Sequence, residues 1–470
     1  MVFPILGGNT ESAEYEVSNS LRFNSADSPK LQETTGSNSN RQRFTFAAWV
    51  KKFGDMGEDQ TLFSANDGGH QPHIKFDNEF EQLNVRISDS ANYNVMTNKA
   101  FRDPSAWYHI VVAMDTTQST ASNRIKIYVN GVQETSLRTT NYPAQNYNSA
   151  FNTNTEHTVG RDISTNNKPF EGYMAEVYFV DGSQLDPTYF GKFNDNGVWI
   201  PVELNKGAGG TITFGTHGFY FEFKQTGTGT NSSGIGADTS GNDNHLAPSN
   251  LAALDVTTDT PTNNFCVLNS ISYPSGLVTN LTEGMLNLLT TDSPYGAVPA
   301  TFALTNGKWY WEIKVNASSD FDRIGLVGTD VPITTSFDFG DTNLGGGTKT
   351  NLAYKSNDGK TRKDGTDQNY GNSYTSGDII GVAYNADDGD IFFYKNGTII
   401  TNTALSITAN KEYFFGGRVY SNATGWEFNF GSPPYSISSG NSDANGYGNF
   451  EYSVPSGYYA LCTKNLAEYG

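Results

Sequence analysis

The sequence predicts an all-β protein made of two antiparallel β-sandwiches in tandem, and three observations support this prediction. Aromatic residues make up 13% of the chain and glycine occurs 49 times, which suits pleated strands joined by turns. Short apolar segments with period-two alternation recur at roughly 8–12-residue spacing, as in sandwiches. No sustained 3.6-residue period or heptad repeat is present. Because 470 residues exceed one ordinary core, more than one domain is expected.

The first sandwich is expected over residues 21–190, after an N-terminal arm at 1–20. Its clearest strands are FTFAAWVKK (44–52), WYHIVVAMD (107–115) and FEGYMAEVYFVDG (170–182). In RIKIYVNGVQET, Asn130 and Gly131 supply the positive φ values that a tight hairpin turn requires. These segments predict a half-buried sheet whose alternate side chains face a core.

A connector rich in Gly, Thr and Asn is expected over residues 191–263. The sequence predicts a short helix near 186–193, with Asp186 as its cap and Pro187 at its first position. One strand, GFYFEFK (218–224), interrupts the connector, whose other segments read as loops.

The second sandwich is expected over residues 264–470. Residues 110–132 and 379–398 share one design, an apolar strand, an acidic turn and a strand ending in Asn-Gly. Both sandwiches should therefore contain the same three-stranded meander. Residues 336–377 are expected to form a long polar loop. The clear strands are KWYWEIKV (308–315), RIGLVGT (323–329), DIIGVAYNAD (378–387), DIFFYKNGTII (390–400), EYFFGGRVY (412–420) and WEFNFG (426–431).

These segments resemble two known families. FTFAAWVKK, LFSAND, WYHIVVAMDTT and FEGYMAEVYFVDG look like a laminin-G/concanavalin-A-like lectin domain, as found in tailed-phage virion proteins. KWYWEIKV, RIGLVGTD, GDIIGVAYNADDGDIFFYKNGT and WEFNFGSPP resemble a SPRY domain. Connecting phrases such as DTSGNDNHL and GYYALCTKNL resemble those of marine phage proteins. The resemblance implies that both antiparallel sandwiches are jelly-roll-like, and that they are binding modules on the tail or capsid surface of a virion.

Charge and composition limit the classes of partner that this protein can be expected to bind. The net charge is −19, which repels nucleic-acid phosphate and anionic lipid, so neither is an expected partner. No run of 18 apolar residues and no basic, apolar leader is present, so we expect no membrane insertion and no signal peptide. A protein of this kind would fold in the host cytoplasm and act on the virion surface.

Two motifs resemble catalytic or metal-binding sites, and each has a simpler interpretation. Asp77, Glu79 and Glu81 alternate as glycosidase carboxylates do, but a solvated acidic strand edge fits them better. His70 and His73 form HxxH in a loop without the helical spacing of a metal site. We therefore expect no enzyme activity and no cofactor, with calcium left open at two weak rim candidates, Asp67 and Asp162.

Loop aromatics set among amides are the favoured ligand contacts. The first sandwich offers Tyr142, Tyr147 and Phe151. The alternative interpretation is that such rings pin the loops to the sandwich or to a neighbouring subunit. The long loop of the second sandwich offers Tyr354, Arg362, Tyr370 and Tyr374.

The two cysteines, Cys266 and Cys462, flank the second sandwich in apolar segments. We expect their strands to lie side by side and close that sandwich, with both thiols buried and reduced.

Three functions are compatible with these observations. The first is a tail fibre or appendage adhesin that binds host-surface glycan or another receptor. The second is a capsid decoration or head-fibre protein whose partners are other virion proteins, and in either role we expect a homo-oligomer. The third is a sandwich-fold polysaccharide depolymerase. The sequence does not name the ligand, the host, the oligomeric state, or a tail rather than a head location, nor whether Gly470 is the natural end.

Overall fold

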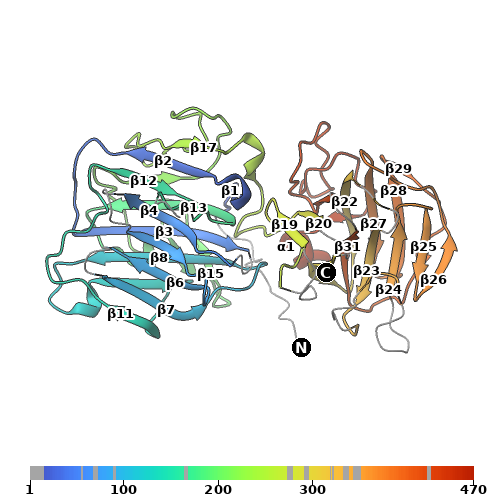
Figure 1. Ribbon diagram of the computed structural model, residues 1–470, viewed down its shortest axis with the longest axis horizontal. Helices are drawn as coiled ribbons and strands as arrows, with labels where there is room; N and C mark the ends of the chain where they lie inside the picture. Colours follow the sequence, from blue (N-terminus) through green and yellow to red (C-terminus); the bar gives the residue numbers. More distant parts are fainter. Residues whose placement is uncertain are drawn as a thin grey trace. The chain divides into compact units, whose positions relative to one another are not determined.

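Strands dominate the computed structural model (Figure 1), as the alternating pattern predicts. The chain divides into two units, Glu11–Thr262 and a second that includes Asn263–Gly470. In the part of the chain that the structure describes, no helix is long and apolar enough to cross a bilayer. The described residues are 15–53, 57–66, 72–87, 92–163, 168–271, 279–290, 296–317, 319, 322–331, 338–341, 351–420 and 425–470.

The first unit is a sandwich of two eight-stranded antiparallel sheets. The first sheet has the order β10 (Val132–Gln133), β9 (Ile125–Val129), β8 (Trp107–Asp115), β3 (Arg43–Lys52), β13 (Gly172–Asp181), β1 (Ser20–Phe23) and β18 (Val256–Thr257), and β16 (Phe219–Phe221) also pairs with β13. The second sheet has the order β11 (Leu137–Asn141), β7 (Asn94–Ala100), β6 (Gln82–Arg86), β5 (His73–Phe76), β4 (Gln60–Asn66), β12 (Glu156–Val159), β2 (Lys30–Thr34) and β17 (Ala247–Ser249).

Aromatic rings from both sheets fill the space between them. Phe46 of β3 stacks on Phe63 of β4 with ring centroids 5.4 Å apart, and Phe179 of β13 lies 4.9 Å from Phe63. All three side chains are buried in one continuous cluster. The period-two alternation therefore does set which side chains enter the core.

Residues 191–262 differ from the expected connector, because they belong to the first unit. They add β16, β17 and β18 to its two sheets, and Phe219 and Phe221 lie in its core. They also form a ribbon of β14 (Gly191–Phe193) and β15 (Trp199–Pro201). The Gly- and Thr-rich composition suggested mobile loops, whereas long-range pairing, which composition does not encode, decides the outcome.

The helix expected near 186–193 is a single 3-10 turn, η3 (Pro187–Tyr189). Its predicted cap is confirmed, because the Thr188 N–H donates to Asp186 Oδ1 at 2.9 Å. The turn ends at Tyr189, and strand β14 begins two residues later at Gly191. Three other 3-10 turns are η1 (Ser25–Asp27), η2 (Ala121–Asn123) and η4 (Ala253–Asp255).

The expected N-terminal arm also belongs partly to the first unit. From Tyr15 onward the chain packs on that unit, and the Val17 N–H donates to Thr262 Oγ1 at 3.1 Å. Ser20 begins β1, which pairs with β13 and β18. The remaining arm residues lie outside the described part of the chain.

The second unit is a sandwich of a nine-stranded and a six-stranded sheet. The larger has the order β19 (Thr279–Thr282), β20 (Asn287–Thr290), β32 (Gly425–Asn429), β22 (Lys308–Ala317), β27 (Ile379–Asn385), β28 (Asp390–Lys395) and β29 (Thr398–Ile399), with β30 (Leu405–Ser406) on β28 and β33 (Tyr459–Ala460) parallel to β22. The smaller has the order β21 (Gly296–Leu304), β31 (Tyr413–Val419), β23 (Arg323–Gly328), β24 (Asn351–Lys355), β25 (Lys360–Lys363) and β26 (Thr366–Asn369).

The long polar loop expected at 336–377 is therefore wrong over much of its length. Strands β24, β25 and β26 form an antiparallel meander there. Only alternate residues such as Leu352 and Tyr354 face the core, so the segment reads as polar although it is paired.

The repeated Asn-Gly design is confirmed in detail. Asn130 and Gly131 turn β9 into β10 with φ of 47° and 78°, and Asn396 and Gly397 turn β28 into β29 with φ of 49° and 75°. Each asparagine Oδ1 accepts a hydrogen bond from a backbone N–H of the preceding long strand, and its own N–H donates back to that residue's carbonyl. The partner residues are His109 and Ile379.

The two cysteine segments lie side by side, as expected. The Cys266 N–H donates to the Leu461 carbonyl at 3.0 Å, and Phe265 pairs with Cys462 in an isolated antiparallel β-bridge. Both thiols are buried and neither is in a disulfide. Helix α1 (Thr463–Tyr469) follows at once.

Candidate functional site

The first candidate surface is the segment after β11, which we name the tyrosine loop (residues 141–148, with Tyr93 beside it). The rings of Tyr93 and Tyr147 meet edge to face with centroids 4.9 Å apart. Tyr142, Tyr147 and Tyr93 are only partly buried, each with one side against the core. Partial burial holds each ring against the core and leaves part of it exposed to solvent.

Hydrogen bonds from separate segments hold the tyrosine loop. Thr116 Oγ1 donates to the Tyr147 carbonyl at 2.7 Å, and Arg124 Nη1 donates to the Pro143 carbonyl at 2.7 Å. Asn141 Nδ2 donates to the Asn92 carbonyl at 2.6 Å. The loop is thus fixed to three different parts of the fold before any ligand arrives.

The loop also carries four exposed amide residues, which are Asn141, Gln145, Asn146 and Asn148. Burial raises the pKa of Tyr142, so its hydroxyl stays a neutral donor and acceptor at ordinary pH. Rings with amide neighbours can stack on an apolar face and hydrogen-bond hydroxyl groups at its edge.

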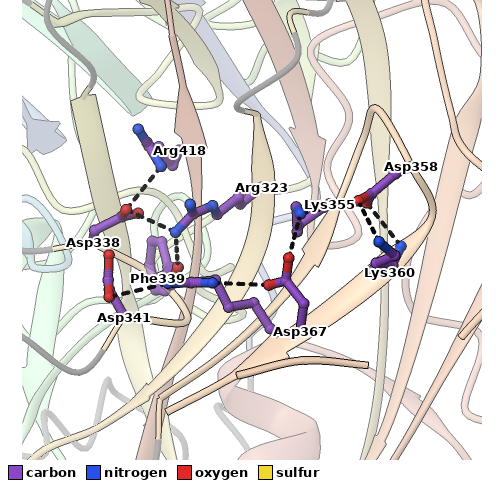
Figure 2. A network of polar contacts seen from close by, with 10 residues as sticks. Arg323, Asp338, Phe339, Asp341, Lys355, Asp358, Lys360, Asp367 and Arg418 are labelled. Carbon is purple, nitrogen blue, oxygen red and sulfur yellow. Dashed lines mark hydrogen bonds and ion pairs between the residues drawn. The ribbon is translucent and has the colours of Figure 1, made fainter. Parts of the chain in front are cut away.

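The second candidate surface is the outer face of the six-stranded sheet, which we name the arginine face (Arg323, Arg362, Arg418, Asp338 and Asp341). Arg323 lies directly opposite Arg418 on β31, so both side chains leave the sheet on the same side. Figure 2 shows Asp338 in contact with both Arg323 and Arg418, and separate contacts of Asp367 and Asp358 farther along the face. Asp338 Oδ2 lies 2.7 Å from Arg323 Nη1 and 2.8 Å from Arg418 Nη1.

The electrostatics of the arginine face change from its buried to its exposed end. Burial raises the pKa of Asp338 above its ordinary value, although the two arginines act in the opposite direction. At the other end, Arg362 pairs with Asp367 at 2.9 Å, and Lys355 pairs with both Asp367 and Asp358. These partly exposed pairs add little stability.

Two family models match this chain. A model described as the concanavalin A-like lectin/glucanases superfamily matches residues 24–186, and a SPRY domain model matches residues 308–433. The chain carries a concanavalin A-like domain followed by a SPRY domain.

Solved SPRY structures are similar to part of the chain. The SPRY domain of human HERC1 is 18% identical, covering 32% of this chain and 91% of its own, with a TM-score of 0.27. The PSpry domain of TRIM65 is 13% identical, covering 35% of this chain and 89% of its own, with a TM-score of 0.28.

Of the ligand residues predicted in the concanavalin A-like domain, Tyr142 and Tyr147 lie together on the tyrosine loop. Phe151 does not, and its prediction is wrong. Its ring is fully buried, 5.2 Å from Phe63 and stacked on it. Tyr93 also lies beside this loop but was not among the predicted residues, because it is distant in the sequence. Its Asn neighbour on each side is the signal that could have identified it.

In the SPRY domain, the predicted tyrosines mainly pack within the sandwich and hold its loops in place, which was the alternative to ligand binding. Tyr354 and Tyr374 are buried, and the Tyr374 hydroxyl donates to the Tyr354 carbonyl at 2.9 Å. Tyr370 is half-buried and its hydroxyl accepts from the Phe393 N–H at 3.3 Å. Of that set, Arg362 alone stands on the arginine face, 3.5 Å from Asp341.

The weak calcium candidates do not form a site that the structure can describe. Asp67 and His70 lie outside the described residues, Asp162 is buried, and His73 is buried on β5. Among the residues that are described, no group of three or more His, Cys, Asp or Glu is arranged to hold a metal ion.

The acidic segment 77–81 is a turn between β5 and β6, so the predicted strand edge is wrong. Asp77 Oδ1 accepts the N–H groups of Glu79 and Phe80 at 3.0 and 3.2 Å. Glu81 is buried and pairs with Lys52 at 3.1 Å. Turn-forming hydrogen bonds and an ion pair account for the carboxylates of Asp77 and Glu81.

Proposed function

We propose that this protein is a non-catalytic binding protein of a tailed-phage virion, and that its concanavalin A-like domain attaches to host-surface glycan through the tyrosine loop. The observation that carries the proposal is the tyrosine loop itself. Its rings are partly exposed, exposed amide residues belong to the same loop, and three separate segments hold the backbone.

Sugar recognition suits this arrangement physically. A pyranose ring presents C–H groups that stack on an aromatic face and hydroxyls that pair with amides. Since the loop is already ordered, binding loses little conformational entropy. The net charge of −19 favours a neutral glycan over a polyanionic one.

The virion context rests on the resemblance of the connecting phrases to those of phage proteins. The non-catalytic part is supported by the roles of Asp77 and Glu81, whose carboxylates hold a turn and an ion pair. A capsid decoration role is the second candidate. It is favoured by the inward-turned Tyr354 and Tyr374, which leave the SPRY domain with a charged outer face suited to protein contacts.

A glycan array probed with the full chain tests the proposal. Tyr147→Ala and Tyr142→Ala should each weaken binding about tenfold, the loss expected when one aromatic contact is removed. Tyr128→Ala is the matched control, because Tyr128 is a half-buried tyrosine of the same domain outside the loop. Unchanged binding by both loop variants would refute the role of the loop. Labelling of the capsid by antibody, with no glycan bound, would support decoration instead.

A further inference from the structure

A tetrapeptide of the chain, Asp338–Asp341, lies across the outer face of the six-stranded sheet and is held there by side chains. Asp338 enters between Arg323 and Arg418, and Asp341 pairs with Arg362 at 3.5 Å (Figure 2). Both charged ends of the tetrapeptide thus meet guanidinium groups that β23, β31 and β25 carry.

The ring between these ends occupies a slot made by two glycines. Gly325 and Gly416 lie directly opposite each other on β23 and β31. A Cβ atom on Gly325 would come within 2.2 Å of the Phe339 ring, and one on Gly416 within 2.8 Å of its Cζ atom. Any side chain at either position would displace the ring.

The backbone of the tetrapeptide is also held by hydrogen bonds. Asn351 Oδ1 accepts the Gly340 N–H at 2.7 Å, and Asn351 Nδ2 donates to the carbonyls of Asp338 and Asp341 at 2.6 and 3.1 Å. Arg323 Nη1 donates to the Phe339 carbonyl at 2.8 Å, and the Gly365 N–H donates to the Gly340 carbonyl at 2.8 Å. All four carbonyl groups therefore accept a hydrogen bond, as those of a bound peptide would.

The hydrogen bonding at Asp338 is uneven. Two buried arginines share a single carboxylate oxygen, Oδ2. In the described residues, Asp338 Oδ1 and Arg323 Nε have no hydrogen-bond partner. Asp338 therefore engages the arginine pair through one oxygen only, and a carboxylate bound through both oxygens would form more charge-assisted hydrogen bonds.

We propose that the arginine face is a peptide-binding site for a protein partner carrying an acid–aromatic–glycine–acid segment, and that Asp338–Asp341 occupies this site as an internal pseudoligand. The tethered segment acts at an effective concentration of about millimolar, so the partner segment must compete with it. Binding in this way couples the partner to release of the chain's own segment.

Fluorescence anisotropy on the full chain tests the proposal, with a labelled synthetic peptide of sequence SFDFGDT, which copies residues 336–342. Asp338→Ala/Phe339→Ala removes the side chains that fill the arginine pair and the glycine slot, so this variant should bind the peptide at least about tenfold more tightly than the unaltered protein does. Adding Arg418→Met should abolish that gain, and so should a peptide with both aspartates replaced by asparagine. Asp358→Ala is the control, because it alters an exposed ion pair near the same face without vacating the slot.

Asp338→Asn covers the case in which the double variant fails to fold, because it keeps the shape of the side chain and removes its charge. It too should bind the peptide more tightly than the unaltered chain does. Equal affinity in all variants would overturn the proposal. Loss of cooperative melting in both variants would also overturn it, because the tetrapeptide would then be an indispensable structural strap.

Discussion

At the scale of single residues, Glu176 is the most unusual side chain of the concanavalin A-like domain. It sits at a β-bulge of β13 with φ of 49° and is 3% exposed. The hydroxyls of Tyr15, Tyr178 and Tyr220 all donate to its carboxylate. Burial raises its pKa to about 7, and the nearby Glu222 acts in the same direction. The folded protein thus favours the protonated acid.

The pH dependence follows from that direction. A carboxyl group whose folded pKa lies above its unfolded value contributes stability below the unfolded pKa, and this stability is lost as pH rises through the folded pKa. Glu176→Gln, which keeps an acceptor for the tyrosines, should therefore raise the unfolding free energy by about 2 kcal/mol at pH 8 and by little at pH 4.5. Urea unfolding of the full chain at both pH values measures this.

Glu81 provides the contrast, because it is also buried but pairs with Lys52. Glu81→Gln removes the charge that pairs with that ammonium and should destabilise the domain at pH 8, by about 3 kcal/mol. A Glu176→Gln variant that is destabilised at pH 8 would show that the ionised form is the one the fold requires.

At the scale of secondary-structure elements, the Asn-Gly hairpins were predictable and the pairing of distant segments was not. Local pattern identified β9, β10, β28 and β29 because the turn chemistry lies within a few residues. The pairing of β16 with β13 and of β17 with β2 joins segments tens to hundreds of residues apart, and no local pattern reports it. The same reasoning explains the candidate site. Tyr142 and Tyr147 follow from loop composition, whereas the burial of Phe151 and the approach of Tyr93 depend on tertiary packing.

Both Asn-Gly hairpins are also covered by an aromatic ring from later in the chain. A Cβ atom on Gly131 would lie 2.2 Å from the Trp199 ring, and one on Gly397 would lie 2.5 Å from the Tyr452 ring. Gly131→Ala therefore adds a ring displacement to the strain of its positive φ. We expect a loss of about 3 kcal/mol, as for overpacking combined with left-handed backbone.

Gly197 separates the two contributions to that loss. It has a similar φ of 76°, but a Cβ atom there meets nothing within 4 Å. Gly197→Ala should therefore lose only about 1 kcal/mol, from backbone strain alone. Equal losses in the thermal unfolding of Gly131→Ala and Gly197→Ala would mean that Trp199 moves aside freely.

At the scale of the whole molecule, the boundary between the two units decides which fragments fold. Sequence composition placed the end of the first sandwich near 190, whereas the first unit extends to Thr262. The added segment supplies Phe219 and Phe221 to the core and brings Asp259 to Lys51, where the buried ion pair is 2.7 Å long. Removing one buried phenylalanine costs about 3–5 kcal/mol, and leaving a buried charge unpaired costs a similar amount.

The sum of those losses, for two phenylalanines and one charge, is comparable to the entire stability of an ordinary domain, which is about 5–15 kcal/mol. A fragment of residues 11–262 should therefore melt cooperatively by circular dichroism, whereas a fragment of residues 11–190 should not. Adding back only 191–213 gives the ribbon of β14 and β15 without β16, and should not restore folding, because the ribbon supplies neither Phe219 nor Asp259. If the 11–190 fragment melted at the same temperature as the longer one, the core would be complete without strands β16 to β18, and folding would not require them. The concanavalin A-like domain would then end where its local pattern ends rather than where its sheets do.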